Sequence, residues 1–120
     1  MAKRGESSID RLARYVALLV YQDGGIEQMI DAAGDSLCKV VAEGGADKAL
    51  TYILIGVARG LASFDDPELR RALAEGRDEA EYLVETVAYR AKHLIMTQSP
   101  NFYRAVLDYI GKRCRRGEVQ

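Results

Sequence analysis

The sequence has little of the material from which catalytic and metal sites are usually built. Among 120 residues it contains one histidine, two cysteines and no tryptophan. A zinc site draws three or four ligands from Cys, His and carboxylates, whereas Cys38, His93 and Cys114 are widely separated in the chain. The sequence also has no redox CxxC pair and no disulfide framework. We therefore expect two unpaired cysteines that act as small buried or half-buried side chains, no metal, no cofactor and no catalytic residue.

An excess of one charge and a long apolar run are also missing. Lys and Arg number 17 against 18 Asp and Glu, which excludes a uniformly basic nucleic-acid binder. The most apolar stretch, residues 49–62, contains Arg59 and is too short to span a bilayer. After the basic start at Lys3 and Arg4, Arg11 and Arg14 interrupt any run of signal-peptide length. We expect a cytosolic protein without a membrane partner.

Period-two alternation is absent, and apolar residues recur instead with the 3.6-residue period of helices. Both prolines, Pro67 and Pro100, follow an Asp or Ser, which is typical of a helix start. The pattern predicts an all-α single domain over residues 1–120, a compact bundle of five main helices and one short one. We expect residues 1–7 and 116–120 to be flexible. The predicted helices cover residues 8–22, 26–43, 46–62, 66–76, 77–97 and a last segment from Ser99-Pro100 onward.

The segment 46–62 is apolar on nearly every side, and a helix of this kind is covered by several neighbours or by a partner chain. Gly56 and Gly60 would permit another backbone to approach closely. Gly34, inside the preceding segment, indicates a kink or a close helix contact. We predict that a partner interface includes Tyr52, Ile55, Gly56 and Arg59.

The charges are separated along the chain. Residues 65–85 contain eight acidic side chains, while residues 111–120 contain four basic side chains and only Glu118 as an acid. This distribution predicts a bipolar molecule, which is suited to head-to-tail self-association. The basic closing segment, with Tyr103 and Tyr109 nearby, also suits contact with a phosphate backbone. A simpler interpretation is that these cations complement a helix C-terminus and keep the tail soluble.

Two segments carry a resemblance to a known family. The string IDAAGDSLCKVVAEGGADKALTYIL (30–54) and the closing FYRAVLDYIGKRC (102–114) resemble the small, all-helical subunit of type III-B CRISPR RNA-guided effector complexes. In that family an apolar helix ends in a Gly turn before an Ala-Leu-x-aromatic-Leu helix. The sequence differs by lacking a Pro before this turn, by having Gly44-Gly45-Ala46 for Asn-Gly-Leu, and by lacking Trp in the closing helix.

The resemblance implies a non-enzymatic subunit, present in several copies that stack head to tail with other effector subunits along a guide RNA. It would contact the RNA backbone without base specificity. The family motif places only Arg104, Lys112 and Arg113 at the RNA, and the other positions follow from the charge distribution. The predicted nucleic-acid-binding residues are Lys3, Arg4, Arg11, Arg14, Lys39, Arg104, Lys112, Arg113, Arg115 and Arg116.

Two other interpretations of the sequence remain. The chain could be a small cytosolic adaptor that oligomerises through the helix 46–62. It could instead be a small helical enzyme or ligand-binding bundle with Tyr52, Glu85, Tyr89 or His93 in an internal pocket. His93 has no Glu three residues before it, so the helical Glu-x-x-His metal motif is absent.

Overall fold

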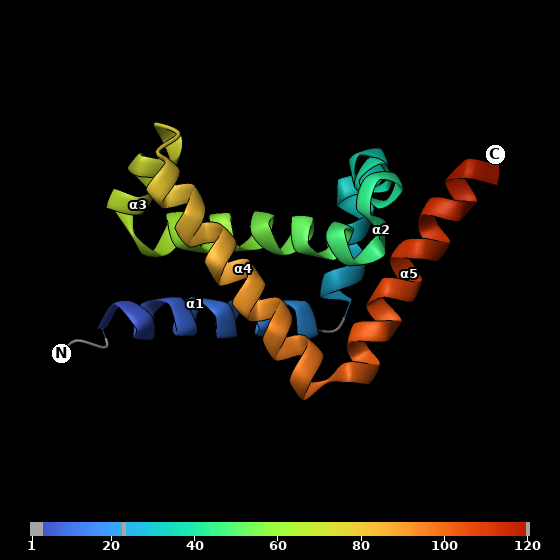
Figure 1. Cartoon of the computed structure of the whole chain (residues 1–120), viewed down its shortest axis with the longest axis horizontal. Helices are drawn as coiled ribbons and strands as arrows, with labels where there is room; N and C mark the ends of the chain where they lie inside the picture. Colours follow the sequence, from blue (N-terminus) through green and yellow to red (C-terminus); the bar gives the residue numbers. More distant parts are fainter. Residues whose placement is uncertain (1–3, 23, 120) are drawn as a thin grey trace.

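The computed structural model describes the backbone of residues 4–22 and 24–119 and the side chains of residues 9–22, 24–64 and 66–115. Over these residues it contains helices and no strands, which confirms the predicted all-α class. Figure 1 shows the elements in an elongated arrangement of 52 × 32 × 23 Å. They are α1 (Arg4–Tyr21), α2 (Gly25–Asp65), α3 (Pro67–Ala74), α4 (Asp78–Gln98) and α5 (Pro100–Val119).

Helix α2 is bent at two glycines, so it consists of three stretches, 25–33, 35–44 and 46–65. Gly34 has φ 56° and ψ −133°, and Gly45 has φ 87° and ψ 177°. A positive φ is sterically costly for residues with a Cβ, which is why glycine occupies both bends. The predicted kink at Gly34 and the predicted break at Gly44-Gly45 are therefore confirmed. The last stretch corresponds to the separate helix expected at 46–62.

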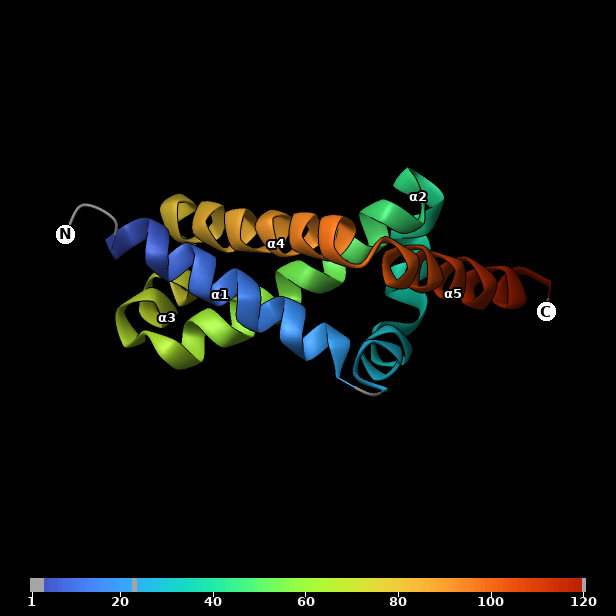
Figure 2. The same cartoon turned by 90° about the horizontal axis from the view of Figure 1, so that it is seen from below.

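Helix α4 crosses both α1 and the last stretch of α2, and these three elements enclose most of the core (Figure 1). Helix α5 packs mainly on α2, at the opposite end from α3, and both views agree on this placement (Figures 1 and 2). The largest fully buried side chains all come from the apolar stripes that predicted the helices. They are Val16, Val20, Ile30, Leu37, Leu50, Leu54, Val84, Val87, Ile95 and Ile110.

The start of α3 follows the predicted Asp-Pro signal. The carboxylate of Asp66 accepts hydrogen bonds from the backbone N–H groups of Glu68 at 3.0 Å and Leu69 at 3.3 Å. Pro67 occupies the first helical position, where its missing N–H costs no hydrogen bond. Helix α1 begins at Arg4, before the predicted start at residue 8, and α5 continues to Val119. The flexibility of residues 1–7 and 116–120 stays a prediction.

Cys38 and Cys114 form a disulfide, so the expectation of two unpaired cysteines is wrong. Their Cα atoms are 5.3 Å apart, although 76 residues separate them in the sequence. Cys114 continues the buried stripe of Val106 and Ile110 on α5, and this stripe packs against α2, where Cys38 follows the buried Leu37. The position of α5 on α2 brings the two sulfurs together, and no spacing rule in the sequence reveals that position.

Candidate nucleic-acid and partner interfaces

The basic residues of α5 divide into engaged and exposed side chains. Arg113 forms an ion pair with Asp31 at 3.0 Å, and Lys112 forms an exposed pair with Asp108 at 3.0 Å. Arg104 and Arg115 are exposed and have no ion-pair partner among the described residues. Arg113 therefore also helps to attach α5 to the first stretch of α2, a role that the sequence did not indicate. Arg104 and Arg115 are the described cations of α5 that are most available to a phosphate.

The remaining predicted cations do not join this group. Arg11 and Arg14 are exposed on α1, and Lys39 is exposed on the middle stretch of α2. The start of α1 and the end of α5 lie at opposite ends of the molecule (Figure 2). The members of the predicted set whose side chains the structure describes therefore do not share one continuous surface. Lys3 and the side chains of Arg4 and Arg116 lie outside the described residues.

The acidic segment lies at the end of the molecule opposite the C-terminal end of α5. It comprises α3 and the first turns of α4, which Figures 1 and 2 both place far from that end. Glu81 is engaged in an ion pair with Arg59, and three arginines of this segment are also exposed. The acidic segment thus carries a net negative charge, although arginines lie among its acidic side chains. Its exposed acids are Asp66, Glu68, Glu75, Asp78, Glu79 and Glu85.

The four predicted partner residues line one groove of about 620 Å³ on α2. The Tyr52 side chain is 49% exposed, and Gly56 borders open space in which an added Cβ would meet nothing within 4 Å. Arg59 donates to both carboxylate oxygens of Glu81, at 2.8 and 2.5 Å. This bidentate contact raises the pKa of the guanidinium and holds Arg59 at the groove. In the described part of the chain nothing lies within 4 Å of a Cβ added at Gly56 or Gly60, so neither glycine takes part in a close helix contact there.

Phe64, which the sequence analysis missed, extends this surface. Its side chain is 90% exposed, and it follows Tyr52, Gly56 and Gly60 at four-residue intervals along α2. Each step of four residues turns about 40° around a helix, so Tyr52 and Phe64 project about 120° apart, with the two glycines between them. A single exposed ring is common on protein surfaces, so Phe64 indicates a contact surface only together with Tyr52 and the adjoining groove.

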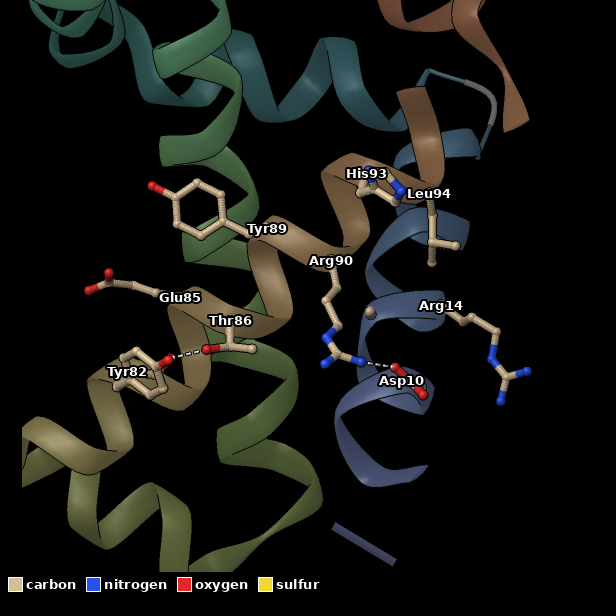
Figure 3. Close-up of a pocket in the computed structure, with 10 residues that line it drawn as sticks. Asp10, Arg14, Tyr82, Glu85, Thr86, Tyr89, Arg90, His93 and Leu94 are labelled. Atoms are coloured by element: carbon tan, nitrogen blue, oxygen red, sulfur yellow. Dashed lines mark hydrogen bonds and ion pairs between the residues drawn. The ribbon is translucent and has the colours of Figure 1, made fainter. Parts of the chain in front are cut away.

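A second, larger groove of about 820 Å³ lies between α1 and α4 (Figure 3). It is open rather than internal, and it is lined by Glu85, Tyr89 and His93, three of the four residues predicted for a pocket. Tyr52, the fourth, lines the other groove instead. Arg14 belongs to the second groove, as does Tyr82, which the sequence analysis did not single out. Its other lining residues are Asp10, Ala13, Thr86, Arg90 and Leu94.

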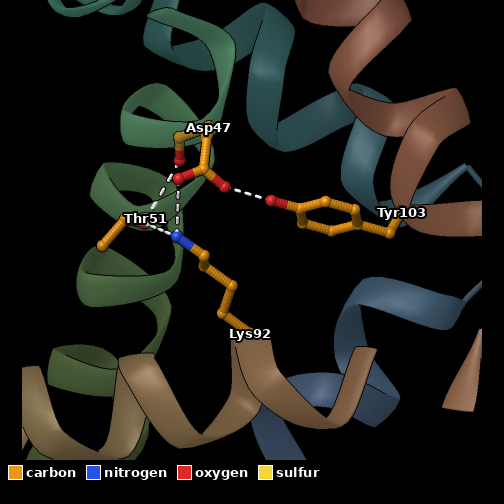
Figure 4. A network of polar contacts seen from close by, with 4 residues as sticks. All are labelled: Asp47, Thr51, Lys92 and Tyr103. Carbon is orange, nitrogen blue, oxygen red and sulfur yellow. Dashed lines mark hydrogen bonds and ion pairs between the residues drawn. The ribbon is translucent and has the colours of Figure 1, made fainter. Parts of the chain in front are cut away.

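A polar network joins α2, α4 and α5 just after the bend at Gly45 (Figure 4). The Lys92 ammonium, on a side chain only 15% exposed, donates to Asp47 at 2.8 Å and to Thr51 at 3.2 Å. The Tyr103 hydroxyl donates to the other oxygen of Asp47. Burial and this hydrogen bond raise the pKa of Tyr103 to about 12. Asp47 is therefore the acceptor that three helices share.

The described residues offer no cluster of three or more His, Cys, Asp or Glu side chains that could hold a metal ion. In the same part of the chain, no helix combines the length and apolar character needed to cross a membrane. No family model matches the sequence, and no curated protein or solved structure is significantly similar to it.

Proposed function

We propose that this chain is a non-catalytic subunit of an RNA-containing effector complex, of the kind used in CRISPR-type antiviral defence. In this proposal several copies stack head to tail and contact the RNA backbone. The observation that carries the proposal is the position of the acidic segment and the basic end of α5 at opposite ends of a 52 Å long molecule. Identical copies can then form heterologous contacts that extend into a row.

Opposite charges at the two ends favour one orientation of neighbouring copies and disfavour the reverse, since like ends repel. The exposed cations Arg104, Arg115, Arg14 and Lys39 lie on three different helices. Such scattered charges suit a subunit that contacts a strand at several points within an assembly. They do not suit a free-standing protein with one strongly basic groove, in agreement with the formal net charge of −1.

The logarithm of the binding constant for a single-stranded RNA is expected to fall linearly with the logarithm of salt concentration. Each phosphate contact adds about 0.7 to the magnitude of this negative slope, because bound counterions are released. The double substitution Arg104→Gln and Arg115→Gln should therefore lower the slope by about 1.4. Fluorescence anisotropy of a labelled RNA strand over a salt series measures this slope.

The matched control for this pair is Arg70→Gln with Arg71→Gln, two exposed arginines on α3 within the acidic segment. It removes the same charge and should leave the slope unchanged. If the wild-type protein shows no detectable RNA binding at about 50 mM salt, the proposed function is wrong. If the control lowers the magnitude of the slope equally, the assignment of the phosphate contacts to Arg104 and Arg115 on α5 is wrong.

Head-to-tail stacking predicts that two variants with opposite defects complement one another. Glu75→Lys with Glu79→Lys reverses charge at the acidic end, and Lys112→Glu with Arg115→Glu reverses it at the basic end. Each variant alone should be monomeric, because every contact needs one acidic and one basic end. An equimolar mixture has opposite charges at both kinds of contact, between two intact ends and between two reversed ends, and should form rows in which the two variants alternate. Sedimentation velocity of each variant and of the mixture measures these states.

The adaptor interpretation is favoured by a different observation, the exposure of Tyr52 and Phe64 on α2. If this surface carries the association, oligomers persist after nuclease treatment and survive the charge reversals. They are then lost on substitution of Tyr52→Ala with Phe64→Ala. That outcome would replace the head-to-tail proposal with an adaptor that pairs through the last stretch of α2.

A further inference from the structure

The groove between α1 and α4 presents two aromatic rings that the fold leaves uncovered. The Tyr82 side chain is 74% exposed and the Tyr89 side chain 55% exposed. Both lie on α4 and are seven residues apart, so they project from one side of the helix with about 10.5 Å between their positions along its axis. His93 follows one turn later in the same groove. The aromatic ring pair that the described residues show is elsewhere, an edge-to-face contact between Tyr21 and Phe102.

The groove is also lined by charges of both signs, from both of its helices. Arg90 reaches from α4 to α1, where it pairs with Asp10 at 2.5 Å, and this pair fixes its guanidinium between the two helices (Figure 3). Arg14, on α1, is exposed and has no ion-pair partner among the described residues. Glu85 lies between Tyr82 and Tyr89 in Figure 3, on the side of the groove away from Arg14. A phosphate backbone can contact Arg14 on α1 while the planar rings lie over α4, with the Glu85 carboxylate between the two rings.

We propose that this groove binds bases of single-stranded RNA, with Tyr82 and Tyr89 as stacking surfaces and Arg14 at the phosphate backbone. The inference rests on the proposed function, which it deepens by naming the surface that contacts the bases. Stacking on an aromatic ring accepts any base, because every base has a π-face. The arrangement thus provides affinity without sequence specificity, as required of a subunit that must accept any guide or target strand.

The test measures anisotropy of a labelled oligouridine and of the same strand with abasic sites. Tyr82→Ala with Tyr89→Ala should weaken binding of the intact strand by at least about tenfold. Binding of the abasic strand should be the same for wild type and variant, because there is no base to stack. The salt slope should stay unchanged in this variant, whereas Arg14→Gln should lower it by about 0.7.

Two further variants test whether the effect depends on the aromatic rings themselves and whether it is specific to the rings in this groove. Tyr82→Phe with Tyr89→Phe keeps both rings and should retain wild-type binding. Tyr15→Ala removes an exposed ring outside the groove and should do the same. If the wild type binds RNA but Tyr82→Ala with Tyr89→Ala binds equally well, this inference is wrong while the proposed function stands. If the wild type binds no RNA at low salt, both are wrong.

Discussion

Reduction of the Cys38–Cys114 disulfide is expected to lower the free energy of unfolding by about 4 kcal/mol. The bond closes a loop with a sequence separation of 76 residues, and in the chain-entropy account the gain from such a crosslink grows with the logarithm of loop length. For a domain of this size the loss corresponds to a decrease in Tm of about 12 °C or more. Chemical denaturation and thermal melting with and without a reductant measure both quantities.

Cys38→Ala supplies the matched control, since Cys38 is half-buried and its loss leaves little cavity. The free energy of unfolding of this variant should match that of the reduced wild type within about 1 kcal/mol. Adding reductant should not change the free energy of unfolding of the variant. If a thiol titration detects two free thiols in protein prepared without reductant, the disulfide does not form. Because α5 packs mainly on α2, we expect the reduced protein to lose hydrogen-exchange protection in α5 before α4.

Asp47→Ala is expected to cost about 2 kcal/mol of the free energy of unfolding. The substitution leaves the largely buried Lys92 ammonium with Thr51 as its remaining described partner and removes the acceptor of the Tyr103 hydroxyl. A fully buried ion pair would cost more, but the Asp47 side chain is 51% exposed and water partly compensates. Urea denaturation at neutral pH measures the change.

The control for this substitution is Asp108→Ala, which breaks the exposed Lys112 pair on α5 and should cost no more than about 0.5 kcal/mol. Equal losses in the two variants would contradict the network. Lys92→Met should be milder than Asp47→Ala, because it leaves a half-exposed carboxylate rather than a buried ammonium without its anion.

The same network predicts an acid-sensitive part of the stability. Burial alone would raise the pKa of Asp47, but the hydrogen bonds from Lys92 and Tyr103 outweigh it and lower the pKa below its ordinary 3.8. A carboxylate with a lowered folded-state pKa stabilises the fold above its unfolded pKa, and this contribution is lost as pH falls through the folded value. The free energy of unfolding should therefore fall less between neutral pH and about pH 4 and below in Asp47→Ala than in the wild type.

Local signals in the sequence predicted much of the fold. Val84, Val87 and Ile95 are fully buried, because a 3.6-residue period places these side chains on one face of a helix. Asp66 caps α3 as the Asp-Pro pair predicted. Gly34 and Gly45 mark real bends, since backbone freedom belongs to the residue itself. Each of these inferences needs only neighbours within a few residues.

The candidate surfaces were predicted less completely. Tyr52, Ile55, Gly56 and Arg59 share one groove, as neighbours on one helix can. Tyr82 and Phe64 were missed, because a single aromatic residue has the same local pattern whether it is buried or exposed. The predicted cations whose side chains are described do not share one surface, and Arg113 is held by Asp31, 82 residues away. Exposure and pairing of these side chains depend on which helix covers which.

The sequence by itself determined the helical class, the faces that are buried and the separation of acidic and basic segments along the chain. Tertiary structure decided what those segments meet. The docking of α5 on α2 joins Cys38 to Cys114 and brings Tyr103 to Asp47, and the crossing of α1 by α4 creates the groove at Tyr82 and Tyr89. Helical periodicity gives a face but not the partner helix or its angle, so contacts between residues far apart in sequence require the folded chain.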